Sequence, residues 1–221
     1  MKRLYLTLSL SLPLAIAPFA NAQTSFDVNL GFGTAHDSAT GLGLDNAASV
    51  NAFGSCSPHS GDTLCQSTPK LNGFFLGFGG DLMLTRHLGA GFEANLQPTQ
   101  SNYGPLQYRQ TFYDFNGIYA PINRKRVALK LEGGVGGART SFSFSQSSCV
   151  GTAVCSSANE PVGTSNHFQA HVGVGLQLYL TDHIFIRPQF DYHYVENFTQ
   201  QFGSNSVPEA TVWVGYSFGE R

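Results

Sequence analysis

The sequence predicts an all-β chain that folds as an eight-stranded antiparallel up-and-down β-barrel. Eight segments alternate apolar residues with polar residues or glycine at period two, the pattern of a strand whose two faces meet different surroundings. The connections between these segments are short and long in strict alternation. With 12% charged residues, 13% aromatic residues and 25 glycines, the composition excludes a disordered chain and a helical coiled coil.

The strand segments cover much of the chain. In the sixth and most regular, Phe168, Val172 and Leu176 fall on one face, and Gln169 and His171 on the other. Most segments are longer than the roughly 5–6 residues of a typical strand and match the roughly 9–11 residues of a tilted membrane-spanning strand. In chain order the segments are 26–33, 73–84, 88–97, 112–119, 127–136, 167–180, 184–194 and 210–218.

The connections define the two ends of the predicted barrel. Because short and long connections alternate, the short turns share one end with both chain termini, and the long loops share the other. Gly, Ser, Asn, Thr and Pro, the residues of turns and loops, dominate the long connections. The short connections are 85–87, 120–126 and 181–183, and the long ones are about 35–70, 98–107, 139–165 and 195–208.

The amino end has the features of a secretory signal peptide. Lys2 and Arg3 precede an apolar stretch, 4–17, and Ala20 and Ala22 form a small-x-small cleavage pattern. The apolar stretch is shorter than the roughly 20 residues of a membrane-spanning helix, which argues against an anchor. We therefore expect a signal peptide at 1–22 and a barrel domain at 23–221.

The two faces of each strand distinguish a membrane barrel from a soluble one. One face carries Phe, Leu, Val, Ile and Tyr along its full length, and the other carries Gly, Asn, Gln, His and most strand charges. A soluble lipocalin-like barrel would bury the apolar face around a ligand. Strand length and the split of turns and loops favour instead a transmembrane β-barrel with a polar lumen, short periplasmic turns and long external loops.

The chain resembles the small eight-stranded outer-membrane β-barrels, the class that includes the barrel of outer membrane protein A. The resemblance rests on the signal peptide, the strand count, the loop asymmetry and the final strand, in which Val212, Val214, Tyr216 and Phe218 alternate. It implies a cell outer-membrane location and recognition of this strand by the barrel-assembly machinery, although three residues follow Phe218. We expect no periplasmic peptidoglycan-binding domain.

The predicted partners follow from this location and from the charge balance. Outer-membrane lipid and lipopolysaccharide would surround a monomeric barrel. Nucleic acid is excluded as a partner, because Lys and Arg together number 12 against 14 for Asp and Glu.

Charged residues on the polar face form the main candidate site. Because they lie at comparable distances from the short turns, they are expected at comparable depth in the lumen. They would form either a packed ion-pair network or a gate lining a narrow pore; an eight-stranded barrel has room for little more than side chains, which favours the network. These residues are Asp27, Asp81, Glu93, Asp114, Lys130, Glu132, Arg187 and Asp191.

Four cysteines form two local pairs in long loops, Cys56 with Cys65 and Cys149 with Cys155. In an oxidising envelope we expect two disulfides; the spacing of these residues matches no zinc motif, even with the histidines of the first long loop.

The polar face also carries His167, His171 and His193 near the loops. They point away from lipid and lack a partner motif for catalysis, so we expect ordinary lumen residues, with no catalytic residue, metal or cofactor. The expected function is a structural or surface-interaction role through disulfide-closed external loops. A narrow small-solute channel is the alternative, and a lipid-modifying enzyme is the third.

Overall fold

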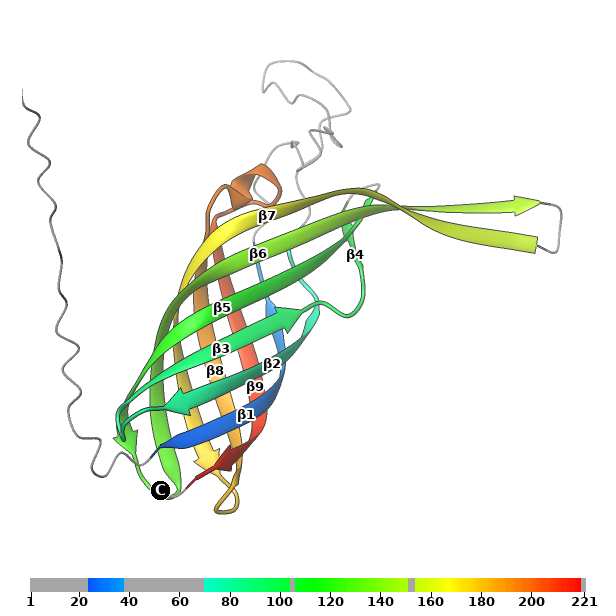
Figure 1. The fold of residues 1–221 in the computed structure, drawn as a ribbon. Coiled ribbons are helices and arrows are strands. Elements are labelled where there is room, and N and C mark those ends of the chain that lie inside the picture. The colour runs from blue at the N-terminus through cyan, green and yellow to red at the C-terminus, as the bar shows by residue number, and fades with distance from the viewer. Residues whose placement is uncertain (1–23, 38–69, 104–105, 151–153, 220–221) are drawn as a thin grey trace, which may run out of the picture.

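The structure is a computed structural model that describes residues 24–37, 70–103, 106–150 and 154–219 (Figure 1). The predicted signal peptide lies outside these ranges and stays a prediction. Within them, no helix is long and apolar enough to cross a membrane. The elements are β1 (Ser25–Ala35), β2 (Phe74–Met83), β3 (Leu88–Leu96), β4 (Ser101–Tyr103), β5 (Leu106–Asn123), β6 (Val127–Val150), β7 (Val154–Tyr179), β8 (Ile184–Val195), the short 3-10 helix η1 (Phe198–Gln200) and β9 (Ser206–Phe218).

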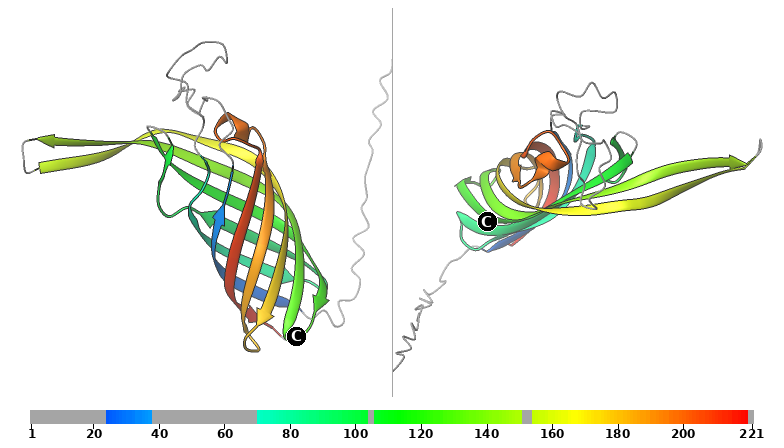
Figure 2. Two further views of the ribbon diagram at one scale, coloured as in Figure 1. Left: turned by 180° about the vertical axis from the view of Figure 1, so that it is seen from behind. Right: turned by 90° about the horizontal axis from the view of Figure 1, so that it is seen from above.

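The strands close into a ring in which every neighbour is antiparallel. The order is β3-β2-β1-β9-β8-β7-β6-β5, and pairing of β3 with β5 completes the circle. The three-residue β4 pairs only with β5 and adds to its rim. The described chain therefore forms an eight-stranded up-and-down barrel, closed between its first and last strands (Figures 1 and 2). The predicted fold class is confirmed.

The apolar faces of the strands point outward and the polar faces point into the lumen. Leu30, Phe115 and Val172 expose 60%, 64% and 63% of their surface, whereas Asp81 and Arg187 are fully buried. Such an exterior has the form of a lipid-facing band. The tight connections between β2 and β3, β5 and β6, and β7 and β8 lie at one end, here called the turn end. The opposite end is called the loop end.

One expected loop is a strand extension. The sequence predicts a long connection at about 139–165, but β6 continues to Val150 and β7 begins at Val154. The paired segments 144–150 and 154–160, here called the β6–β7 ribbon, project beyond the barrel (Figure 2). Serine-rich strands outside both lipid and core need no alternating apolar face, so hydrophobic periodicity did not reveal them.

Three other predicted connections, 98–107, 120–126 and 195–208, partly belong to strands or to the 3-10 helix. Strand β5 starts at Leu106 and runs to Asn123, through the expected turn 120–126. The register between β5 and β6 shifts between Tyr119 and Ile122, around Pro121, as expected where proline interrupts a strand ladder. At the loop end, η1 and the start of β9 lie in the expected loop 195–208.

The only tryptophan of the chain, Trp213, lies inside the lumen, and its size accounts for the glycines found at neighbouring positions. It is fully buried. A Cβ atom at Gly31 would lie 2.7 Å from Trp213 Cε3, and one at Gly77 would also meet the indole ring. Glycine at these positions makes room for the largest side chain in a lumen of only eight strands.

An apolar cluster closes the lumen at the loop end. We call it the aromatic cap. Its buried members come from seven strands, from the residues just before β2, and from η1 and the residues that follow it. The larger ones are Phe75, Tyr103, Tyr108, Phe112, Phe142, Phe198 and Phe202. Tyr103 packs edge-on against Phe142 and Phe202, with ring centroids 5.0 Å and 5.5 Å apart. A small hydrophobic core thus fills this end of the lumen in the described part of the chain.

Candidate functional site

An ion-pair network occupies the middle of the lumen, and we call it the Arg187 network. Arg187 of β8 donates from Nη1 to Asp81 Oδ2 (2.6 Å) and Glu132 Oε1 (3.3 Å), and from Nη2 to Glu93 Oε1 (2.6 Å). Its guanidinium also lies 5.6 Å from the centre of the Trp213 ring. A guanidinium suits this position because its rigid fork donates in several directions at once.

Lys130 extends the Arg187 network towards the turn end. Its Nζ donates to Asp27 Oδ2 (2.9 Å) and Asp81 Oδ2 (2.6 Å). Asp81 therefore bridges the two cations, and the network joins β1, β2, β3, β6 and β8. All these side chains are at least nine-tenths buried. Removing one member of a buried network would leave the others charged and unpaired.

The structure separates the predicted lumen charges into two layers. Among the described residues, Gln189 links Asp191 to the Arg187 network, because its Nε2 donates to Glu93 Oε2 (3.0 Å) and Asp191 Oδ2 (3.0 Å). Asp114 lies opposite Glu93 in the β3–β5 register, yet it contacts histidine rather than Lys130 or Arg187. Because barrel strands are tilted and staggered, counting residues from a turn does not give depth across several strands.

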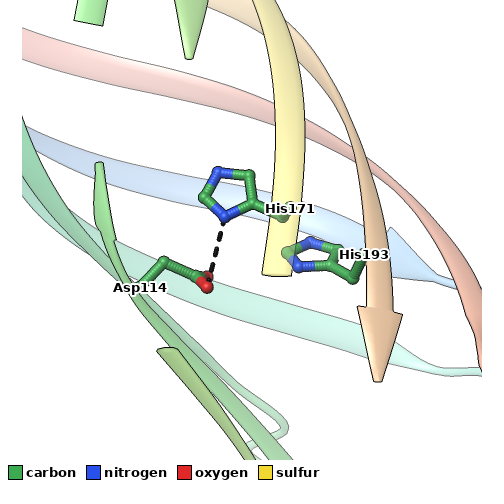
Figure 3. A group of neighbouring side chains, drawn as sticks. All are labelled: Asp114, His171 and His193. Atoms are coloured by element: carbon green, nitrogen blue, oxygen red, sulfur yellow. Dashed lines mark ion pairs between the residues drawn. The ribbon is translucent and has the colours of Figure 1, made fainter. Parts of the chain in front are cut away.

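The second layer brings Asp114 of β5 together with His171 of β7 and His193 of β8 (Figure 3). All three side chains are buried. His171 Nδ1 lies 3.2 Å from Asp114 Oδ1, and His193 Nε2 lies 3.3 Å from Glu209 Oε2. Gln169 Nε2 donates to Asp114 Oδ1 (2.6 Å). The ring of His193 stacks on Phe112 of the aromatic cap at 5.3 Å.

The third predicted histidine, His167, lies apart from this layer. It is only partly buried, and its Nδ1 lies 2.9 Å from the carbonyl oxygen of Glu196.

Sequence patterns missed the aromatic cap and the role of Glu209. Phe75 and Phe112 occupy lumen-facing positions. Aromatic residues on the otherwise polar face of a strand, close to a loop, were the sequence signal that could have predicted the cap. Glu209 directly precedes the predicted eighth strand and pairs opposite Asp191. Its position in phase with Thr211 and Trp213 places it in the lumen.

A cavity enters the lumen from the turn end. It has a volume of about 280 Å³ and reaches Asp27 and Lys130, with Arg86, Arg124 and Tyr179 among its other lining residues. Beyond it lies the Arg187 network. The lumen is therefore open to water on the turn side and filled by side chains further in.

The remaining predicted site residues are at the barrel surface and in the loops. Val212, Val214, Tyr216 and Phe218 alternate outward along β9, which pairs with both β1 and β8. Cys56 and Cys65 lie outside the described residues. Cys149 is opposite Cys155 in the β6–β7 register, and their side chains lie outside what the structure describes.

Comparison with known proteins identifies this architecture. Residues 5–218 match the family described as outer membrane protein beta-barrel domain. The chain belongs to this family. It is an outer-membrane β-barrel protein of the Gram-negative type, so the turn end is periplasmic and the loop end is external. No curated protein sequence matches the chain.

Solved outer-membrane barrels are similar in fold. Ail, the attachment invasion locus protein of Yersinia pestis, was solved in complex with the heparin analogue sucrose octasulfate. Its sequence is 11% identical, the match covers 89% of this chain and 99% of Ail, and the TM-score is 0.51. The N-terminal β-barrel domain of Pseudomonas aeruginosa OprF is 15% identical, with coverage of 90% and 100% and a TM-score of 0.47. Neisserial surface protein A is 10% identical, with coverage of 90% and 98% and a TM-score of 0.48.

Replacing Arg187 by glutamine (R187Q) is expected to destabilise the barrel by about 3–5 kcal/mol, because Asp81, Glu93 and Glu132 lose a shared cation in a buried site. Urea unfolding of the barrel in vesicles, followed by heat-modifiable gel mobility, measures the change. The control is K125Q, which removes an exposed pair with Asp182 (3.8 Å) and should cost no more than about 0.5 kcal/mol. Equal effects of the two substitutions would show that the Arg187 network does not stabilise the fold.

Proposed function

We propose that this protein is a closed, non-conducting barrel that acts at the cell surface through the parts of the chain beyond the external membrane boundary. The observation that carries the proposal is the filling of the lumen. The aromatic cap closes its external side and the Arg187 network occupies its middle. Strands β6 and β7, by contrast, continue past the barrel as the β6–β7 ribbon.

A narrow channel for small solutes is the alternative proposal. The periplasmic cavity of about 280 Å³, which reaches Lys130, favours it. Passage from this cavity to the outside would require both Arg187 and the aromatic cap to move. A lipid-modifying enzyme is the third and weakest candidate, because His171 and His193 are buried in the lumen, away from lipid. A deacylase assay on outer-membrane lipid would reveal such an activity.

In planar lipid bilayers, the purified folded protein is expected to give no steady single-channel steps, because the buried side chains of the aromatic cap and the Arg187 network fill the described part of the lumen. Heat-unfolded protein in the same detergent serves as the control for leaks that detergent causes. Reproducible conductance steps of one size, seen with the folded protein and not with the control, would contradict the closed barrel and support the channel.

We further propose that two arginines hold the external leaflet at the barrel wall. Arg109 of β5 lies opposite Ser141 and Arg139 of β6 lies opposite Thr111, so the arginines are diagonal neighbours. Diagonal positions are about 7–8 Å apart, within reach of long side chains. Both arginines are exposed. Tyr113 continues the same outward face of β5 towards the membrane.

The chemistry of this pair suits the phosphate groups of lipopolysaccharide. Two adjacent guanidinium groups repel each other unless an anion lies between them, and guanidinium binds phosphate through paired hydrogen bonds. The location also fits, because the pair lies just external to the apolar band, where the phosphates of the outer leaflet gather.

The double variant R109Q/R139Q is expected to bind fluorescent lipid A at least tenfold more weakly, since each basic group at an anionic surface contributes about 1 kcal/mol. The titration uses the folded barrel in neutral detergent micelles. The control is R124Q/R126Q, which removes the same charge from two exposed arginines at the periplasmic end. If both variants lose affinity equally, net charge rather than this pair attracts the lipid.

The external disulfides remain part of the proposal. The β6–β7 register places the backbones of Cys149 and Cys155 opposite each other near the tip of the ribbon, which supports this pairing among the three that four cysteines allow. Alkylation without reduction, followed by peptide mass mapping, is expected to recover Cys149 linked to Cys155. Alkylated Cys149 in protein isolated from the envelope would contradict this pairing.

A further inference from the structure

The layer of histidines in the lumen has the composition of a transition-metal site. Asp114, His171 and His193 each offer one ligand atom, and these atoms all lie within 4.8 Å of one another (Figure 3). They come from β5, β7 and β8, so the lumen rather than any single loop brings them together. Two imidazoles and one carboxylate are the ligands of many zinc sites.

The imidazole nitrogens of His171 and His193 are buried, and two of the four have no polar partner among the described residues. The side chains of His171 and His193 are only 1% and 2% exposed. None of their four ring nitrogens meets hydrogen-bond geometry with a described group. Two of them nevertheless face carboxylates, His171 Nδ1 at 3.2 Å from Asp114 and His193 Nε2 at 3.3 Å from Glu209. Buried polar atoms nearly always have a partner, so the other two nitrogens, His171 Nε2 and His193 Nδ1, indicate that another species belongs there.

The surrounding side chains provide the support that metal ligands need. A metal-bound histidine usually directs its other nitrogen to a carboxylate, which fixes the ring. His193 has this arrangement, because Nε2 faces Glu209 Oε2 at 3.3 Å and leaves Nδ1 for an ion. Glu209 is itself held by Thr211, whose Oγ1 donates to Oε1 (3.0 Å). Gln169 holds Asp114 in the same way (2.6 Å).

We propose that Asp114, His171 and His193 bind a divalent transition-metal ion of the zinc class inside the barrel, with Glu209 as a positioning residue. The separation of 3.2 Å between His171 Nδ1 and Asp114 Oδ1 already suits two ligands of one tetrahedral ion. A pair at the limit of 4.8 Å would need to close by about 1.4 Å, since tetrahedral ligands at about 2.0–2.1 Å from zinc lie about 3.4 Å apart. Calcium and magnesium are excluded by the two nitrogen ligands.

The site would connect β5, β7 and β8 directly beneath the aromatic cap, where His193 stacks on Phe112. The cap lies on the external side and the Arg187 network on the periplasmic side. The ion would therefore enter as the barrel folds and would exchange slowly afterwards. This inference departs from the sequence-based expectation of no metal, because strand alternation does not show which residues share a depth.

The test uses Co²⁺ as the probe, added during refolding of the chelator-treated protein with its cysteines oxidised. We expect one Co²⁺ per barrel after desalting, with visible d–d absorption bands and no thiolate charge-transfer band. Excess Zn²⁺ present during the same refolding should prevent these bands, and the Zn²⁺-refolded protein should need a higher temperature to shift its heat-modifiable gel band. Absence of bound Co²⁺ and of any effect of Zn²⁺ would overturn the proposal.

Variants assign the bound ion to the site. H171Q and H193Q are each expected to weaken binding at least 100-fold, and E209Q about tenfold, as is usual for loss of a group that orients a ligand. The matched control is H167Q, on the same strand as His171 but outside the cluster, which should bind Co²⁺ as the parent protein does. Full retention of the ion by folded H171Q/H193Q would overturn the site.

X-ray absorption at the zinc edge of the unsubstituted protein gives an answer that does not depend on the variants folding. Imidazole scattering with nitrogen and oxygen neighbours supports the site. Sulfur neighbours would assign the ion to the external cysteines and overturn the proposal.

Discussion

The structure depends on neutralising the charges that are buried in the middle of a narrow lumen. Arg187 meets three carboxylates from three other strands, and Asp81 shares its charge with Lys130. This requirement selects the register of the barrel. The alternating pattern of apolar residues and glycine repeats every two residues, so a slip of two would keep every outward residue facing lipid. The same slip would separate Arg187 from Asp81, Glu93 and Glu132. We infer that the charges define the register and the apolar faces define only the inside and outside.

The narrowness of the lumen also accounts for the unusual composition. Charges are scarce because one face of each strand meets lipid, where a charge at mid-bilayer costs up to about 2–4 kcal/mol. Glycine is abundant partly because a large lumen side chain needs an empty position opposite it. Trp213 shows this most clearly, since it fills the space that side chains at Gly31 and Gly77 would occupy. The indole in turn lies beside the guanidinium of Arg187, so packing and charge meet at one place.

Sequence patterns predicted the strands well where a lipid face imposed alternation, and poorly elsewhere. The expected segment 184–194 corresponds to β8, Ile184–Val195, because both of its faces have a fixed environment. The β6–β7 ribbon has neither lipid nor core beside it, so alternation disappeared although the strands continue. The alternation along each strand predicted which residues face the lumen. It did not predict which of these residues contact one another. Asp114 belongs with His171 rather than Arg187, and strand stagger decides this.

Different side chains fill the lumen at different depths, and their order along the barrel axis determines which residues are isolated from solvent. From the periplasm, water reaches Lys130 through an open cavity. The Arg187 network then excludes water by packing, and the aromatic cap excludes it by being apolar. Asp114, His171 and His193 lie between these two barriers, with side chains that are at most 3% exposed. Buried polar atoms in such a position gain most from a bound partner, because the low dielectric strengthens every interaction that is made. The same isolation that closes the pore thus creates the conditions for a tightly held ion.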